Sequence, residues 1–358
     1  MEQGYQMTIN RLPAPTWNWL HMNESSVTDI KPENRDAFFF AELPKGVIYN
    51  QDKRQLNTIV SGMGKDMDRL LDTANVSAQQ FVIGEGENVE EPLQLHLSYG
   101  DNANGIHAVE LIAMENSRST IVMDYTSKAR MGVGAVSTKI HVKRNASVQL
   151  IQVQLLGEEF VHLNDVGVWC EKGGSMEVIQ LFLGARETYS GWRSDLFEDE
   201  SNMTVKVGYL GRDRQKIDMN YVAEHSGRKT KSYIRANGIL KDEARKLFRG
   251  TIDFKTGCIG AEGEETEDVL LLGEDVVNQT IPLILCGEEQ VQGNHGATIG
   301  KLDEEVLFYL CSRGMTKEDA INQVAMARLE ALNHEIPSGK VQDLVQNYLK
   351  GVFDNEME

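Results

Sequence analysis

The middle of the chain is a long succession of short segments in which apolar and polar residues alternate. Residues 140–142, 148–150, 176–183 and 203–209 are examples, and glycine, asparagine and aspartate separate such segments. Each segment is too short for a helix, whereas a period of two suits a strand with one buried face. No long amphipathic helix intervenes between residues 81 and 300, which argues against a doubly wound α/β fold.

Two architectures fit so many short strands. One is a large antiparallel sandwich or barrel, and the other is a solenoid whose coils stack as parallel β-sheets. Two-residue hairpin turns between well-formed strands are absent except near Asn237 and Gly238. Because antiparallel neighbours are commonly joined by such turns, the pattern favours the solenoid, although no strict repeat is visible.

The residues before the strand-rich region show a different sequence pattern. Residues 1–80 form a mixed, partly helical region, with Trp17 and Trp19 expected as packing anchors. We therefore expect three parts: an N-terminal mixed or helical region (1–80), a β-helix core (81–301) and a C-terminal helical docking module (302–358). Helical spacing between residues 52 and 73 predicts a helix there, carried by Leu56, Ile59, Val60, Met63, Met67, Leu70 and Leu71.

The C-terminal part contains three helices with clear start and stop signals. Asp303 is placed to cap a helix that ends at Gly314, and residues 316–319 resemble a capping box that opens a second helix. Pro337 ends the second helix. The three helices must bury their apolar stripes on one another or on a partner. The second stripe holds Ile321, Val324, Ala325, Leu329 and Leu332, and the third holds Val341, Leu344, Val345, Tyr348 and Leu349.

Composition excludes several classes of partner. The formal net charge of −18 would repel nucleic acid and anionic membranes. No apolar run reaches the roughly 20 residues needed to span a bilayer. The first residues lack a basic segment followed by an apolar one, so no export signal is expected and a cytoplasmic location follows. The cysteines occur singly, which fits a reducing compartment and gives no local zinc ribbon or four-thiolate cluster site: Cys170, Cys258, Cys286 and Cys311.

Sequence motifs for nucleotide binding and hydrolysis are missing. The GxxxxGK[ST] pattern is absent, and no GxSxG or HExxH occurs. The eight histidines show no i, i+2 or i, i+4 pairing. We expect a solvated loop at His225, in EHSGRKTKS, and structural roles for four others: His96, His107, His141 and His162. Any ATP hydrolysis linked to this chain must then take place in another protein.

His295 is the histidine with the strongest functional signal. It lies between Asn294 and Gly296, so its ring can face outward or across a subunit interface. Neutral imidazole is a good iron ligand, and a carboxylate that bonds its other nitrogen can fix the ring. Cys286 lies nine residues earlier, and a thiolate near the imidazole would suit a transient iron site. An apolar setting favours a buried core cysteine instead, so both readings of Cys286 stay open, and the role of Cys258 is open too.

Several longer strings resemble one family, SufB/SufD of the Suf iron–sulfur cluster assembly system. The strings are FRGTIDF (248–254), VLLLGED (269–275) and the stretch 278–315, which contains HGATIG and LFYLCSRG. The resemblance implies a mostly β fold, a right-handed parallel β-helix with N- and C-terminal helical regions. It also implies a SufB–SufD heterodimer or a homodimer, and docking of the C-terminal helices onto SufC, an ABC-type ATPase. The docking residues implied are Asp303, Phe308, Tyr309 and Arg313.

Single positions indicate the SufD branch of that family. The form Asn294-His295-Gly296 resembles SufD, and Glu267 stands where SufB proteins carry a scaffold cysteine. Many SufD proteins have a cysteine at the position of Gly293 here. The resemblance therefore implies one metal or nascent-cluster ligand, His295, with thiolates supplied by a partner. It implies no cofactor held stably by this chain alone, and a transient iron–sulfur cluster or iron at the SufB interface.

The functional hypothesis is a SufD-like subunit of a SufB–SufC–SufD scaffold complex, which is an assembly factor and not an enzyme. One alternative is a homodimeric protein that acts with SufC alone. A remote alternative is a β-helix carbohydrate-active enzyme, for which an export signal and clustered acids and bases on one coil face would be expected. The three-helix C-terminal part has no place in that alternative.

Overall fold

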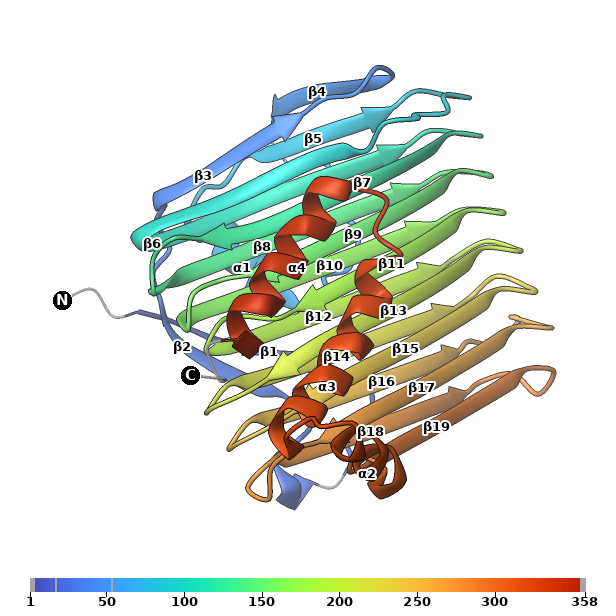
Figure 1. Ribbon diagram of the computed structural model, residues 1–358. Coiled ribbons are helices and arrows are strands. Elements are labelled where there is room, and N and C mark those ends of the chain that lie inside the picture. Colours follow the sequence, from blue (N-terminus) through green and yellow to red (C-terminus); the bar gives the residue numbers. More distant parts are fainter. Residues whose placement is uncertain (1–3, 17, 53, 355–358) are drawn as a thin grey trace.

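The computed structural model describes residues 4–16, 18–52 and 54–354. Its body is a parallel β-helix of about eight turns, with helices toward both ends of the chain (Figure 1). The predicted fold class is thus confirmed, and the solenoid is the correct choice over the antiparallel sandwich. The coils descend in Figure 1 from the blue strands near β6 to the orange strands β18 and β19.

Two parallel faces make up the β-helix. One face contains β7 (Arg118–Ser127), β9 (Ser147–Leu155), β11 (Ser175–Phe182), β13 (Asn202–Gly211), β15 (Lys231–Leu240), β17 (Glu262–Leu271) and β19 (Gln292–Gly300). The other contains β5 (Ala78–Ile83), β8 (Met131–Val142), β10 (Glu159–Cys170), β12 (Glu187–Leu196), β14 (Lys216–His225), β16 (Arg245–Phe254) and β18 (Val277–Cys286). The long strand β6 (Leu93–Ala113) pairs in both faces.

Antiparallel strands cover the first edge of each face. β3 (Arg35–Glu42) pairs with β6, and β4 (Val47–Asp52) pairs with β5. Parallel strands then follow without interruption to β18 and β19. An antiparallel neighbour stops the parallel array at this end, whereas the described residues include no such strand at the opposite end of the β-helix.

One corner of the β-helix is a ladder of left-handed residues. Asn116, Asn145 and Gly173 have φ of 59°, 54° and 66°, and each donates its backbone N–H to a carbonyl of the next coil. The coils differ in length: Ser175 pairs with Asn202, 27 residues on, and Lys231 pairs with Glu262, 31 residues on. Because coil length varies, the repeat has no fixed period in the sequence.

Side chains fill the lumen of the β-helix. Its core combines aliphatic residues with large aromatic ones, and buried amides bind the aromatic hydroxyls. Gln152 donates to the Tyr125 hydroxyl over 2.9 Å, and Gln180 donates to Gln152 over 2.6 Å. Each buried polar group that finds such a partner avoids the cost of desolvation. The largest fully buried aromatic side chains include Trp192, Tyr125, Tyr189, Tyr209 and Tyr221.

Buried charged side chains bind the N-terminal segment to the outside of the β-helix. β1 (Tyr5–Ile9) and β2 (Ser25–Ile30) form an antiparallel pair, and the short 3-10 helix η1 (Asn18–Leu20) lies between these two strands in the sequence. β3 follows β2 along the chain. Arg249 of β16 binds Asp218 of β14 over 2.7 Å, and both side chains are fully buried. Arg249 also donates to the Met22 carbonyl over 2.6 Å, so the segment and the coils share one hydrogen-bond network.

The predicted N-terminal helix is shorter than its apolar spacing indicated. α1 runs from Lys65 to Thr73 only, and the preceding residues form a loop packed on the β-helix. Buried carboxylates hold this loop: Glu110 accepts from Leu56 N over 2.8 Å, and Asp165 accepts from Met63 N over 2.8 Å. The expected anchor Trp19 is 70% exposed, and Trp17 lies outside the described residues.

The C-terminal helices are α2 (Glu304–Ser312), α3 (Lys317–Asn333) and α4 (Gly339–Asp354), as their caps predicted. Figure 1 shows α3 and α4 lying across the β7–β17 face. Their apolar stripes pack on that face, not on a partner, through Leu329, Val345 and Leu349 against strand residues such as Ile179 and Leu181. Among the described helices, none combines the length and the apolar character needed to cross a bilayer. The predicted region boundaries at 80 and 301 stay predictions.

Candidate functional site

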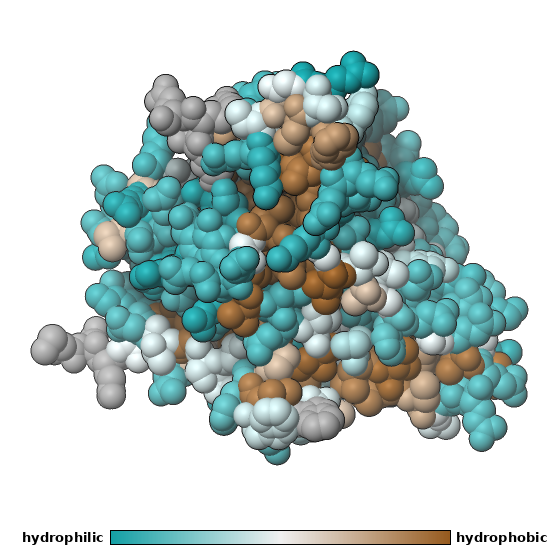
Figure 2. All heavy atoms as spheres, turned by 60° about the horizontal axis from the view of Figure 1, so that its bottom comes forward, coloured by the Kyte–Doolittle hydropathy of each residue, from teal (hydrophilic) through white to brown (hydrophobic). Residues whose placement is uncertain are grey.

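The β-helix has one open end, formed by β18 and β19. β18 pairs only with β16 and β19 pairs only with β17 among the described strands, so each presents an unpaired edge. Figure 2 turns this end toward the viewer and shows hydrophobic side chains reaching the surface, bordered by hydrophilic ones. Exposed apolar side chains of this end include Val277 and Ile299. Unpaired edges and exposed apolar groups are features of a surface that binds another chain.

His295 lies on β19 and faces the open lumen. It pairs in register with Glu265 of β17, whose side chain is buried inside the β-helix. Gly293, two residues before His295, is on the same side of the strand, because a Cβ there would lie 3.1 Å from Ile284 and from Phe254. His295 is nevertheless exposed, since β19 belongs to the last coil in the part of the chain that the structure describes. The ring is therefore available to a ligand or to a partner chain.

Cys286 is exposed, which corrects the expectation of a buried core cysteine. It ends β18 at a position that faces the lumen in earlier coils, where its register partner Phe254 is buried. Cys258, in contrast, is buried near Phe254. Burial raises the pKa of the Cys258 thiol to about 11, and the charge of Glu288 adds to this shift. Cys258 is thus a protonated packing residue at neutral pH, and Cys286 is the accessible thiol of this end.

Directly inside the open end lies a buried polar cluster that sequence reasoning missed. Lys246 of β16 forms an ion pair with Glu267 of β17 and donates to the Thr280 hydroxyl over 2.9 Å. Thr280 donates to Glu267 over 2.7 Å, and the Tyr209 hydroxyl donates to it over 3.2 Å. Burial lowers the pKa of Lys246, and the Glu267 charge opposes that shift. Glu267 is therefore a fully engaged structural acid.

Glu265 completes the cluster and has a different environment. It is 3% exposed, and burial raises its pKa to about 8, with a further contribution from the charge of Glu267. A sequence signal for both acids exists, because they stand at even spacing from the core residue Val269 and so share its inward direction. Because acids at core positions are rare unless they are paired, these two inward-facing acids could have indicated the cluster from the sequence.

The predicted docking residues lie on or beside α2. Asp303 caps this helix and accepts from Glu305 N over 2.8 Å, as expected. Phe308 and Tyr309 are 76% and 56% exposed, and the Arg313 guanidinium lies 5.3 Å from the centre of the Tyr309 ring. No residue of α2 is buried. Whereas α3 and α4 bury apolar side chains on the β7–β17 face, α2 leaves Phe308 and Tyr309 exposed and only half-buries its leucines.

Three other histidines, His225, His141 and His162, lie in packed surroundings. His225 is not in a solvated loop, which corrects the expectation: it is fully buried at the end of β14 and bonds Thr230 and Ser232. Its flanking polar residues indicated a loop, but the ring itself turns into the lumen against Phe254. His141 bonds Glu171 over 2.8 Å, and His162 is fully buried with no hydrogen-bond partner for either ring nitrogen among the residues described.

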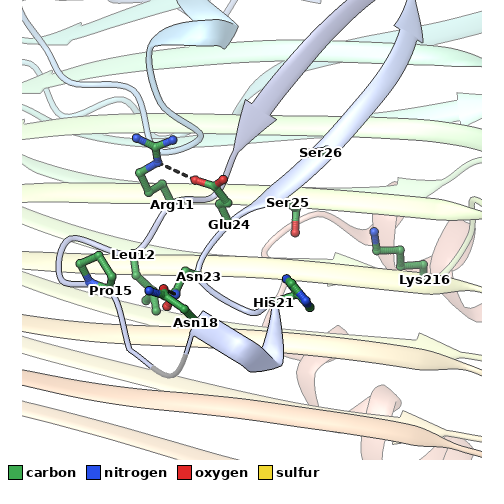
Figure 3. A pocket seen from close by; sticks show the side chains of 10 residues that line it. All are labelled: Arg11, Leu12, Pro15, Asn18, His21, Asn23, Glu24, Ser25, Ser26 and Lys216. Carbon is green, nitrogen blue, oxygen red and sulfur yellow. Dashed lines mark hydrogen bonds and ion pairs between the residues drawn. The ribbon is translucent and has the colours of Figure 1, made fainter.

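A cavity of about 610 Å³ lies between the N-terminal segment and β14. Figure 3 shows Arg11 held by Glu24 over 2.8 Å, with Lys216 on the opposite side of the cavity. Its cationic groups therefore do not converge on one point. In the ranges that the structure describes, no three His, Cys, Asp or Glu side chains are arranged to hold a metal ion. His295, with Cys286 as a weaker second, thus stands as the candidate ligand of the open end.

Comparison with known proteins agrees with this architecture. The family model described as SUF system FeS cluster assembly, SufBD core domain, matches residues 96–328. The iron–sulfur cluster assembly protein SufD of Bacillus subtilis is 26% identical over 272 residues, which are 75% of this chain and 62% of that protein. Iron–sulfur cluster assembly SufBD family proteins of Staphylococcus aureus and Staphylococcus epidermidis are each 24% identical over 75% of this chain.

The alignments leave a large part of these relatives unmatched. The chain spans 62% of the Bacillus subtilis protein and 58% of the two staphylococcal proteins. The family model begins at residue 96, in β6, and ends at residue 328, within α3. It therefore includes the whole open end of the β-helix, together with His295, Glu267 and α2.

Proposed function

Because the chain belongs to the SufBD family of the SUF iron–sulfur cluster assembly system, we propose that it is a SufD-like subunit of a cytoplasmic SufB–SufC–SufD scaffold complex. Its role is to assist ATP-linked cluster assembly as a scaffold and not as an enzyme. The observation that carries the proposal is His295, a single exposed imidazole at the uncovered end of the β-helix. The cluster is cargo of this system, not a resident cofactor of the chain.

The ligand set explains why a partner is needed. Iron–sulfur clusters are held mainly by thiolates, and one imidazole cannot hold a cluster alone. The position expected to carry a scaffold thiolate holds Glu267, whose carboxylate is occupied by Lys246, Thr280 and Tyr209. Cys286 is the one exposed thiol at this end and is a weaker candidate ligand. The proposal is that a SufB-like subunit meets the unpaired edges and supplies the missing thiolates.

The second contact in the proposal is between α2 and SufC. Phe308 and Tyr309 offer a hydrophobic surface, and Asp303 and Arg313 border it with charge. A large exposed apolar patch with a polar rim is typical of a protein interaction site. The ATPase cycle of SufC can change the assembly only if its states bind α2 with different affinities.

Co-purification from the native host tests the proposal. The tagged full chain should recover an ABC-type ATPase together with a SufB-like subunit. Recovery of the ATPase with a second copy of this chain, and no SufB-like subunit, would select the homodimeric alternative. Recovery of neither partner under conditions in which the chain is folded would contradict the proposed function.

A further inference from the structure

One buried acid at the open end has an unused oxygen. Glu265 Oε2 has no hydrogen-bond partner among the described residues, although the side chain is only 3% exposed. Its carboxyl group occupies space left by Gly250, where a Cβ would come within 2.2 Å of the Glu265 carboxyl carbon. A buried acceptor without a partner is destabilising, because it has lost its hydrogen bonds to water. Such a group calls for a partner other than the residues packed around it.

His295 is the residue placed to be that partner. It is the register neighbour of Glu265 on the adjacent parallel strand, and such neighbours project to the same side with strands roughly 4.8 Å apart. The two flanking lumen-facing positions of β19 carry Gly293 and Ala297, which leave the ring room to turn. Because His295 is exposed and Glu265 is fixed by packing, the ring can move to the carboxyl group and not the reverse.

The neighbouring acid cannot take this role. Glu267 receives hydrogen bonds from Thr280 and Tyr209 and pairs with Lys246. Its register partner on β19 is Ala297, which has no group to bind. Of the two lumen acids, Glu265 therefore combines a free oxygen with a histidine on the adjoining strand.

We propose that Glu265 is a positioning residue for His295: its carboxyl group accepts a hydrogen bond from one ring nitrogen and thereby presents the other nitrogen outward to iron or a nascent cluster. This inference rests on the proposed function. An acceptor on the non-ligating nitrogen fixes both the tautomer and the direction of the ring. The carboxyl group itself stays inside the lumen and does not touch the metal.

The test uses the ring of His295 as reporter in the full chain. The ¹⁵N chemical shifts of its imidazole, assigned by their loss in His295→Ala, measure which nitrogen carries the proton. We expect one dominant tautomer in the unchanged protein and a redistribution in Glu265→Gln. Glu264→Gln is the matched control, because Glu264 is exposed on the outer side of the same strand. An identical tautomer ratio in the unchanged protein and in folded Glu265→Gln would overturn the inference.

A second measurement, on His295→Ala, tests the same pairing if Glu265→Gln does not fold. His295→Ala changes an exposed side chain, and it should shift the ¹³C titration of the Glu265 carboxyl carbon. No shift would overturn the pairing. In the reconstituted complex, Glu265→Gln should weaken iron binding by roughly ten- to a hundredfold. If Glu265→Gln changes the tautomer ratio but His295→Ala leaves the cluster yield unchanged, the pairing stands and the proposed function is contradicted instead.

Discussion

Lys246 and Glu267 form an ion pair inside the β-helix in which the two side chains are 0% and 1% exposed. Lys246 comes from β16 and Glu267 from β17, so the pair joins the two faces of the coil next to the open end. Thr280 of β18 bonds both partners and extends the network into the last coil. An acid at this position is thus tied to the packing of the lumen.

Removal of one partner of this pair should be strongly destabilising. Glu267→Ala leaves the Lys246 ammonium buried without its carboxylate, and breaking such a pair typically costs about 3–5 kcal/mol. Urea unfolding followed by circular dichroism measures the free energy of unfolding. The double variant Lys246→Met with Glu267→Leu should recover most of the loss, because it leaves no unpaired charge.

Glu264→Ala is the control for that experiment. Glu264 is exposed on the same strand, and surface substitutions of this kind usually change stability by less than about 0.5 kcal/mol. Equal losses in Glu267→Ala and Glu264→Ala would contradict the buried pair. So would a double variant less stable than Glu267→Ala.

Gly238 should tolerate no side chain. The Tyr209 ring lies over it, and a Cβ there would come within 1.9 Å of a ring carbon. Since Tyr209 is fully buried, Gly238→Ala must displace the ring and should cost about 1–3 kcal/mol or more. Gly296→Ala, where nothing lies within 4 Å of the added Cβ, should leave the midpoint of urea unfolding unchanged. Equal midpoints for both variants would contradict the packing described here.

His162 should make the protein sensitive to acid. Burial lowers the pKa of its imidazole from 6.5 to about 3, so below about pH 6.5 the unfolded chain binds a proton that the folded chain does not. Stability therefore falls as pH falls, by about 1.4 kcal/mol for each pH unit between these values. His162→Leu removes this contribution. Its free energy of unfolding should rise relative to the unchanged protein by about 1 kcal/mol between pH 6.5 and pH 5.5, because the unfolded histidine is already half protonated at pH 6.5, and parallel curves would contradict the assignment.

Local signals predicted the C-terminal helices correctly. Asp303 and Thr316 are helix caps in the structure, and each side chain accepts the backbone N–H that capping requires. The solenoid was also predictable, because alternation without hairpin turns leaves few other folds. The period of the solenoid could not be predicted, since coils of 27 and 31 residues fit the same register. The turn ladder fixes one left-handed residue per coil and lets the rest of each coil vary.

Tertiary context decided the positions at which the predictions were wrong. Leu56 and Met63 are buried as a helical pattern requires, but backbone contacts to Glu110 and Asp165 hold them in a loop. Cys286 occupies a lumen-facing position that would be buried in any coil but the last. Which coil is last depends on where the stacking ends, and alternation within one strand carries no information on that.

The aromatic surface of α2 should matter for binding and not for folding. Phe308→Ala with Tyr309→Ala should leave the melting temperature within about 2 °C, because both side chains are exposed. The same variant should lose the ABC-type ATPase in co-purification. Leu344→Ala on α4 is the control, since Leu344 is also an exposed apolar residue on a C-terminal helix. Retention of the ATPase by the α2 variant would contradict docking through this helix.

Cluster formation in the reconstituted complex shows whether His295 takes part in assembly. His295→Ala and a control, His334→Ala, are each combined with the partner subunits, iron, a sulfur source and ATP, and cluster is measured by its visible absorption. Both histidines are exposed, so both variants should fold and assemble normally. We expect a severalfold lower cluster yield for His295→Ala and an unchanged yield for His334→Ala. Equal yields for His295→Ala and the unchanged protein would contradict the role of His295 in cluster assembly.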